Sequence, residues 1–137
     1  DGYLDVPEHA HDSRWIHRPR MDWTLAGARH EGDTPSARVF RGTKAILARR
    51  RATEALHAAH PVRVVSVGND AVLAFQRMAP TGTLIGLFNF TEDWRQVPEQ
   101  WARALGATGM WDQLSDAPVV THQGQIVLPP YARVWLT

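Results

Sequence analysis

The sequence predicts a mostly β protein, in which an antiparallel β-sandwich follows a long irregular lead and one amphipathic helix. Three observations support this prediction. From Arg63 onward, seven or eight short extended runs alternate with turns rich in Gly, Pro, Asn or Asp, as in a sandwich. One stretch before them has helical periodicity. Residues 1–33 show neither pattern and read as loop.

The predicted helix begins at Thr34 and Pro35. Thr34 is a suitable N-cap, and Pro35 suits the first helical position because its fixed φ is helical and its missing N–H is not needed there. Apolar residues then recur at steps of three and four, and they are Val39, Phe40, Thr43, Ile46 and Leu47. A stripe of this kind has to pack against another part of a protein.

The strands follow from residue 63. "RVVSV" and "AVLAFQRM" predict a hairpin across the turn "GND", and "TLIGLFNF" predicts a third strand. The remaining strands are expected in "WRQV", "GMWDQL", "PVVTH", "GQIVLP" and "ARVWLT", with one helical turn in "PEQWARAL". Basic residues and histidines concentrate before Pro61, so we expect two parts, residues 1–60 and 61–137.

Composition excludes several classes of function. The formal net charge is +1, which gives no electrostatic reason to expect binding to nucleic acid or to an anionic membrane. No apolar run approaches the length that spans a bilayer. The three consecutive residues Arg49, Arg50 and Arg51 point around most of a helix, so we interpret them as helix-end charge.

Few residues suggest a metal or catalytic centre. His9 and His11, flanked by Glu8 and Asp12, could ligate a divalent ion, but a polar surface loop explains them equally well. We expect no metal and no cofactor. The carboxylates of the lead show no fixed pair for acid–base catalysis, and no nucleophile triad or phosphate loop stands out, so we expect no catalytic residue in this chain.

Aromatic residues are frequent in the predicted sandwich, namely Trp94, Trp101, Trp111, Tyr131 and Trp135. They could form a platform on which sugar rings stack, although aromatic residues of a sandwich are more often core. An alternative function is therefore a stand-alone, non-catalytic sandwich module that binds carbohydrate or a protein.

The densest chemistry lies in "DSRWIHRPRMDW", residues 12–23. Arg14, Arg18 and Arg20 alternate in a run that Pro19 helps to keep extended. Their guanidinium groups could pair with carboxylates or bind a hydroxyl-rich ligand, or they could form a salt-bridge network that anchors the loop. The residues alone leave both interpretations open.

These motifs resemble a known family. "DSRWIHRPRMDW", then "VFRGTKAILARRRATEALH", and the ending "LPPYARVWLT" are similar, in this order, to the C-terminal part of amylosucrases and of the related sucrose hydrolases in the α-amylase superfamily. The resemblance implies a parent with a (β/α)₈ barrel followed by a C-terminal β-sandwich. Residues 1–60 would then be the last βα-loop and final helix of the barrel, and residues 61–137 the sandwich.

The resemblance also implies roles. The parent would cleave sucrose with retention and transfer the glucosyl unit to an α-glucan or to water. Arg14 would pair with an aspartate of an early barrel loop and close the pocket for the glucosyl unit. We expect His17 and Arg18 to support it as substrate-binding residues, with Trp15 and Arg20 beside them. The catalytic carboxylates would come from the remainder of the barrel, so we expect this chain alone not to cleave sucrose.

Overall fold

The computed structural model describes residues 7–9, 11–12, 14 and 21–137. The chain divides after Thr43 into two units, each of which is described here by itself. The elements, in chain order, are η1 (Pro7–His9), α2 (Trp23–Gly27), η2 (Ala28–His30), α3 (Pro35–Ala52), η3 (Glu54–Leu56), β1 (Val62–Val65), β2 (Val72–Ala79), β3 (Gly82–Asn89), β4 (Arg95–Pro98), α4 (Glu99–Ala104), β5 (Trp111–Asp112), β6 (Ala117–Pro118), β7 (Thr121–His122), β8 (Gln125–Leu128) and β9 (Arg133–Leu136).

The first unit contains short helices where the sequence predicted only loop, so that prediction was wrong for residues 7–9 and 23–30. Asp22 caps α2, because its Oδ1 accepts a hydrogen bond from the Leu25 N–H at 3.0 Å. The helix α3 begins as predicted. Thr34 Oγ1 accepts from the Ala37 N–H at 3.1 Å, and Pro35 is the first helical residue.

The second unit begins inside α3. Arg49, in the last turn of this helix, places Nη2 at 2.7 Å from Oδ2 of Asp116 in the loop between β5 and β6. A cation at a helix C-terminus is favourable by itself, because it lies near the exposed carbonyls. After α3, the short helix η3 buries Ala55 and Leu56.

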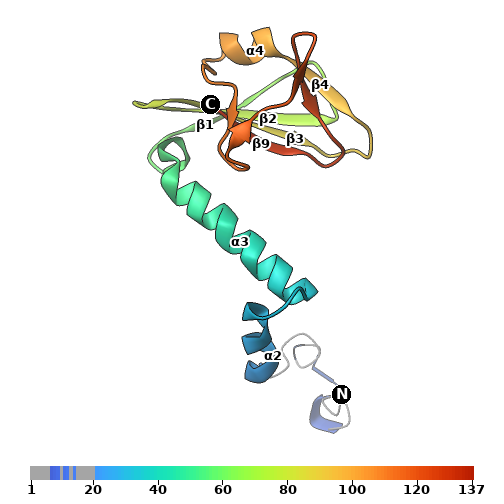
Figure 1. The fold of residues 1–137 in the computed structure, drawn as a ribbon. Coiled ribbons are helices and arrows are strands. Elements are labelled where there is room, and N and C mark those ends of the chain that lie inside the picture. The colour runs from blue at the N-terminus through green and yellow to red at the C-terminus, as the bar shows by residue number, and fades with distance from the viewer. Residues whose placement is uncertain (1–6, 10, 13, 15–20) are drawn as a thin grey trace. The chain divides into compact units, whose positions relative to one another are not determined.

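Two antiparallel sheets make up most of the second unit (Figure 1). The larger sheet has the strand order β1-β2-β3-β9-β5-β6, and the smaller has the order β4-β8-β7. The hairpin of β1 and β2 and the pairing of β2 with β3 occur as predicted. The structure is therefore mostly β with two antiparallel sheets, which confirms the predicted fold class.

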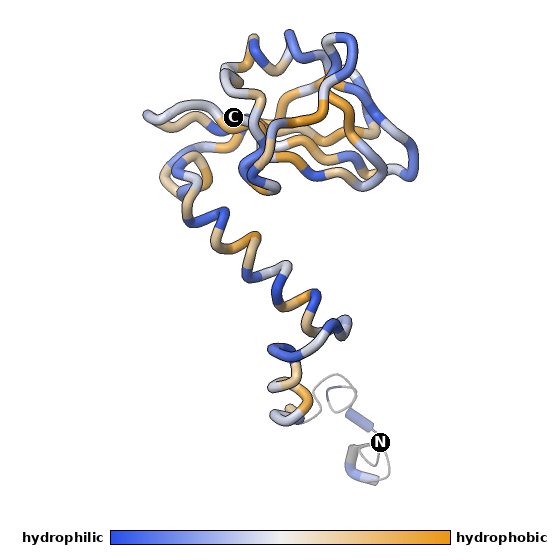
Figure 2. The backbone as a smooth tube through the Cα atoms, viewed as in Figure 1, coloured by the Kyte–Doolittle hydropathy of each residue, from blue (hydrophilic) through white to orange (hydrophobic). Residues whose placement is uncertain are grey.

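One core lies between the sheets. Alternate residues point into it from the larger sheet, such as Val72 and Leu87, and from the smaller sheet, such as Val97 and Ile126. Ala102 of α4 completes the contact. In Figure 2 these strands carry much of the hydrophobic colouring of the second unit. The core contains no disulfide, since the chain contains no cysteine.

A second, smaller cluster occupies the other face of the larger sheet. Leu84 of β3 is fully buried there by Ala55 and Leu56 of η3. Phe75 of β2 lies directly over Gly86 of β3, and a Cβ at position 86 would come within 2.4 Å of the Phe75 ring. Gly86 is therefore required for this close approach.

One edge of the larger sheet is strand β1, which pairs with β2 alone among the strands of the described residues, and the other edge is β6. Val62 and Val64 on this strand are exposed. Between them, Arg63 donates a hydrogen bond from Nη2 to Oε1 of Gln76 at 2.7 Å.

Buried Asn89 joins two loops at one end of the sandwich. Its amide nitrogen donates to the carbonyl oxygens of Asp93 and Pro129, each at 2.8 Å, and its Oδ1 accepts from the Thr91 N–H at 3.0 Å. Tyr131, in the second loop, has φ of 55°, which is unfavourable for a bulky residue. The bonds of Asn89 help to hold this backbone in place.

Replacing this amide should destabilise the sandwich. Asn89→Ala leaves buried carbonyl groups without donors, so the free energy of unfolding should fall by about 2–3 kcal/mol. Chemical denaturation followed by tryptophan fluorescence measures this change. The control Gln100→Ala removes an exposed amide in α4 and should change stability by less than about 0.5 kcal/mol. Equal effects of the two variants would contradict the role assigned to Asn89.

Candidate functional site

The substrate-binding residues predicted from the sequence fall in the lead. Of these, Arg14 is described by the structure, whereas His17 and Arg18 lie outside the described residues. The same holds for Trp15 and Arg20, which were expected beside them. The structure therefore gives geometry for Arg14 only.

Arg14 forms a two-pronged ion pair with a neighbour in the sequence. Its Nη2 lies 2.6 Å from Oδ2 of Asp12, its Nε lies 2.9 Å from Oδ1, and its backbone N–H donates to Oδ1 at 3.0 Å. The Arg14 side chain is nevertheless 74% exposed. The guanidinium therefore has a local and solvent-accessible carboxylate partner, and its pairing with an aspartate of an early barrel loop stays a prediction.

The electrostatic effect of this pair is mutual. The side-chain hydrogen bond from Arg14, followed by the one from its backbone N–H, holds the pKa of Asp12 below the usual value for an aspartate. The same side-chain bond raises the pKa of Arg14. Both groups therefore stay charged through the neutral pH range.

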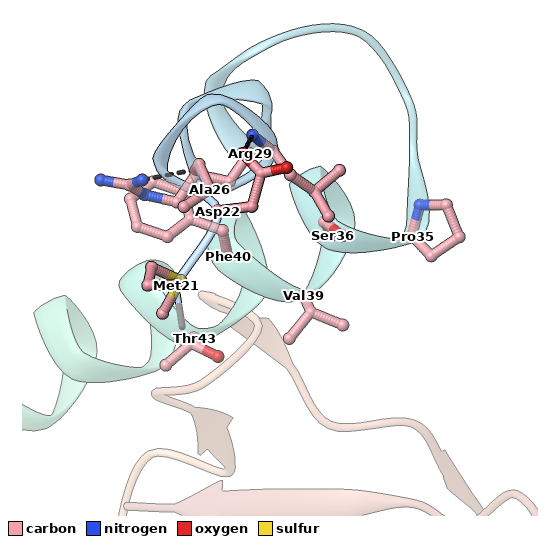
Figure 3. Close-up of a pocket in the computed structure, with 10 residues that line it drawn as sticks. Met21, Asp22, Ala26, Arg29, Pro35, Ser36, Val39, Phe40 and Thr43 are labelled. Carbon is pink, nitrogen blue, oxygen red and sulfur yellow. Dashed lines mark hydrogen bonds between the residues drawn. The ribbon is translucent and has the colours of Figure 1, made fainter. Parts of the chain in front are cut away.

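A hollow in the first unit was not predicted from the sequence. It lies between α2 and the start of α3 and has a volume of about 670 Å³ (Figure 3). Its lining is Met21, Asp22, Leu25, Ala26, Arg29, Pro35, Ser36, Val39, Phe40 and Thr43. Most of these side chains are apolar or small, so the hollow resembles a packing surface more than a polar reaction centre.

Polar groups at the hollow are already engaged with their own unit. Asp22 caps α2, and Arg29 donates from Nη1 to the Ala26 carbonyl oxygen at 2.5 Å (Figure 3). The Arg29 guanidinium carbon lies 5.2 Å from the centroid of the Phe40 ring, a cation–π distance. His30 meets the same ring edge-on at 4.8 Å. The signal for this arrangement in the sequence was the capping aspartate, three residues before Leu25.

The candidate sugar platform of the sandwich is not one surface. Trp101 packs against the main core and donates from Nε1 to the Ser66 carbonyl oxygen at 3.0 Å. Trp135 packs against the smaller cluster. Trp94 and Tyr131 are well exposed, and Trp111 is only just so. The expected set therefore separates into two tryptophans partly buried against the clusters and three residues that are exposed.

One carboxylate of the sandwich, that of Asp112, has a structural role. Buried Asp112 accepts hydrogen bonds from the N–H groups of Leu114 and Trp135 at 3.0 and 2.8 Å, and from the Ser115 hydroxyl at 2.6 Å. Within residues 7–9, 11–12, 14 and 21–137, no three His, Cys, Asp or Glu side chains come together as metal ligands. No helix in the described part is long and apolar enough to cross a membrane.

Comparison with known families adds the identity of the sandwich. A family model described as the C-terminal domain of amylosucrase matches residues 62–137. The matched segment begins with β1 and includes both sheets and α4. The matched segment covers more than half of the chain. It coincides with the part, residues 61–137, that the sequence predicted to be the β-sandwich. The chain therefore belongs to the amylosucrase C-terminal domain family.

Proposed function

We propose that this chain acts as the C-terminal part of a sucrose-cleaving, retaining enzyme of the amylosucrase type. In this proposal, residues 1–60 complete the catalytic barrel with its last loop and helix, and residues 61–137 form a structural sandwich. The observation that carries the proposal is the family match over residues 62–137. The chemistry of the lead and the exposed apolar residues of α3 support it.

The apolar residues of α3 favour a covering surface from another part of the enzyme. Val39 is 69% exposed, and Ile46 and Leu47 are exposed as well. Across the 18 residues of this helix, only Ala37 is buried. Because leaving large apolar side chains in water forfeits about 25 cal/mol per Å² of possible burial, a stripe of this kind is usually covered in a folded enzyme.

The proposed role of Arg14 is to close the pocket that holds the glucosyl unit. Its planar set of donors matches a carboxylate, and an Arg–carboxylate pair offers fixed donors to sugar hydroxyls. In the complete enzyme Arg14 would exchange Asp12 for an aspartate of an early barrel loop. Because the pair with Asp12 is exposed to solvent, this exchange costs little. His17 and Arg18 would support Arg14 from the same loop.

The bond cleavage itself is assigned to the barrel. A retaining mechanism needs two carboxyl groups about 5 Å apart across the glycosidic bond, one as nucleophile and one as acid and base. The proposal takes both from the remainder of the barrel. Whether the glucosyl unit goes to an α-glucan or to water then depends on acceptor sites that also belong to the barrel.

Activity on sucrose tests the role of Arg14. In an amylosucrase-type enzyme that carries this chain, Arg14→Ala should lower kcat/KM for sucrose about 100-fold or more, because a buried carboxylate loses its partner. Arg14→Lys should recover only part, since the ammonium group of a lysine cannot form the planar, two-pronged pair with a carboxylate. The control Arg103→Ala, at an exposed pair with Glu99, should have no effect. Near-normal activity of Arg14→Ala would remove Arg14 from the pocket. The chain alone should release no fructose.

The titration of Asp12 tests the ion pair of the chain alone. Its pKa should lie below the ordinary value of about 3.9 and return to it in Arg14→Ala. The pair's contribution is fully present above about pH 4 and is lost as the pH falls through the lowered pKa. Carboxyl-carbon NMR as a function of pH measures both values. An unchanged pKa in Arg14→Ala would show that the two side chains do not pair in solution.

The exposed face of α3 tests the covering surface. In the chain alone, Val39→Ser should change the free energy of unfolding by less than about 0.5 kcal/mol. In the complete enzyme it should cost about 2 kcal/mol, because the covered site loses methyl groups and gains a hydroxyl. Val120→Ser, at an equally exposed valine of the sandwich, should be neutral in both. A neutral Val39→Ser in both proteins would favour a stand-alone sandwich module.

A further inference from the structure

The outer face of the smaller sheet carries a cluster of side chains that the proposed function does not use. Val97 of β4 and Ile126 of β8 point into the core and have no exposure. Successive side chains of a strand alternate in direction, so Gln96 and Val127 point away from the core. The register places Gln96 directly opposite Val127. The Val127 N–H donates to the Val120 carbonyl oxygen at 2.9 Å, which brings Val120 beside them.

These residues line an open hollow of about 680 Å³. Its lining includes Trp94, Gln96, Val120, His122, Val127 and, from the loop between β1 and β2, Asn69. The two valines form an apolar floor, because Val120, just before β7, lies beside Val127 of β8. The amides and the imidazole are the polar groups around that floor.

Trp94 gives the hollow an aromatic surface. It lies just before β4 and is 65% exposed, unlike Trp101 and Trp135, which pack against the two clusters. An exposed indole offers a flat face with negative electrostatic potential. The C–H groups on one side of a pyranose ring carry partial positive charge and match such a face. A large exposed aromatic side chain inside a hollow, with polar groups around it, is typical of a binding site.

The charge of the hollow favours a neutral ligand. The remaining lining residue, Arg95, already donates from Nη2 to Oδ2 of Asp93 at 2.9 Å and from Nε to Thr91 Oγ1 at 3.1 Å. Carboxylate side chains are missing from the described lining. Anions such as phosphate therefore find no free cation, and cations find no carboxylate.

The polar groups suit hydroxyls. Amide side chains contain a donor and an acceptor, as does a sugar hydroxyl, and the ring nitrogens of an imidazole can also bond to a hydroxyl. The Asn69 Oδ1 accepts from the Ala71 N–H at 3.0 Å, which fixes its amide with the NH₂ group available. The hollow is lined by side chains on the outer face of the smaller sheet, whereas an added peptide strand pairs with backbone groups at a sheet edge.

We infer that this hollow is a binding site for a neutral oligosaccharide, with one hexopyranose ring stacked on Trp94 and its hydroxyls bonded to Gln96, Asn69 and His122. In the sequence, the residues that line this site are distant from the loop that contains Arg14. The site has no part in bond cleavage. That the oligosaccharide is an α-glucan rests on the proposed function. In that case the site would hold polymer at the surface of the enzyme.

Calorimetric titration of the whole chain with maltoheptaose tests the inference. Binding should be weak, in the millimolar range, because a single stacked ring and a few hydrogen bonds must offset the ordering of a flexible ligand. Trp94→Ala should weaken it about tenfold, and Trp94→Phe should retain part of it because an aromatic face remains. Gln96→Ala should weaken it several-fold. The control Trp111→Ala removes an indole outside the hollow and should bind as the original chain does.

The outcomes are distinct. Absence of binding at roughly 10 mM maltoheptaose would overturn the inference, as would equal binding by the Trp94→Ala chain. It would also be overturned if Trp94→Ala changed the sedimentation of the chain and not its glucan affinity, since Trp94 would then serve a protein contact. Thermal unfolding verifies that each variant is folded. These measurements do not involve sucrose, so the inferred site and the proposed function stand or fall separately.

Discussion

The pairing of β2 with β3 is the constraint on which the sandwich depends. Eight residue pairs align in one antiparallel register, from Val72 opposite Asn89 to Ala79 opposite Gly82. This register sends Val72 and Leu87 toward the core and Phe75 toward the other face. A slip by one residue would exchange the faces and expose the whole apolar set. The ring of Phe75 over Gly86 opposes such a slip, because any larger residue at that position would collide with it.

The two parts of the chain differ in how they satisfy their side chains. The sandwich buries its large apolar residues and fastens its loops with the buried polar groups of Asn89 and Asp112. The helix α3, in contrast, buries only Ala37 within the described residues. In the lead, the charges of Arg14 and Asp12 satisfy each other at the surface. The sandwich thus satisfies these side chains within its own fold, whereas α3 leaves large apolar side chains exposed.

The sequence allowed most of the fold to be predicted, because its signals are local. Thr34 and Pro35 mark the start of α3, and the turn "GND" separates β1 from β2. The short helices of residues 23–30 were missed, because a five-residue helix has no periodic pattern and depends on one capping bond from Asp22. Which tryptophans pack against the clusters was also beyond prediction. That property depends on the packing of the two sheets and, for Trp94, on a position just before a strand begins.

The geometry of the predicted site could be inferred from the sequence less completely than the fold. A pattern of arginines indicates carboxylate pairing, and Arg14 does form such a pair, but the pattern does not say which carboxylate it selects. The nearest one, Asp12, lies only two residues away. The roles of His17 and Arg18 remain predictions, because these residues lie outside the described part of the chain.

The exposed edge at β1 has a consequence for how this protein behaves at high concentration. A border strand with exposed valines presents free backbone groups to which another chain can add, and this is a common route to aggregation. Two residues oppose such addition here. Pro61, immediately before the strand, has no N–H to donate, and Arg63 places a positive charge on the strand itself, which identical chains would have to bring together. Residues at and next to strand β1 thus oppose the addition of further chains at this edge of the sheet.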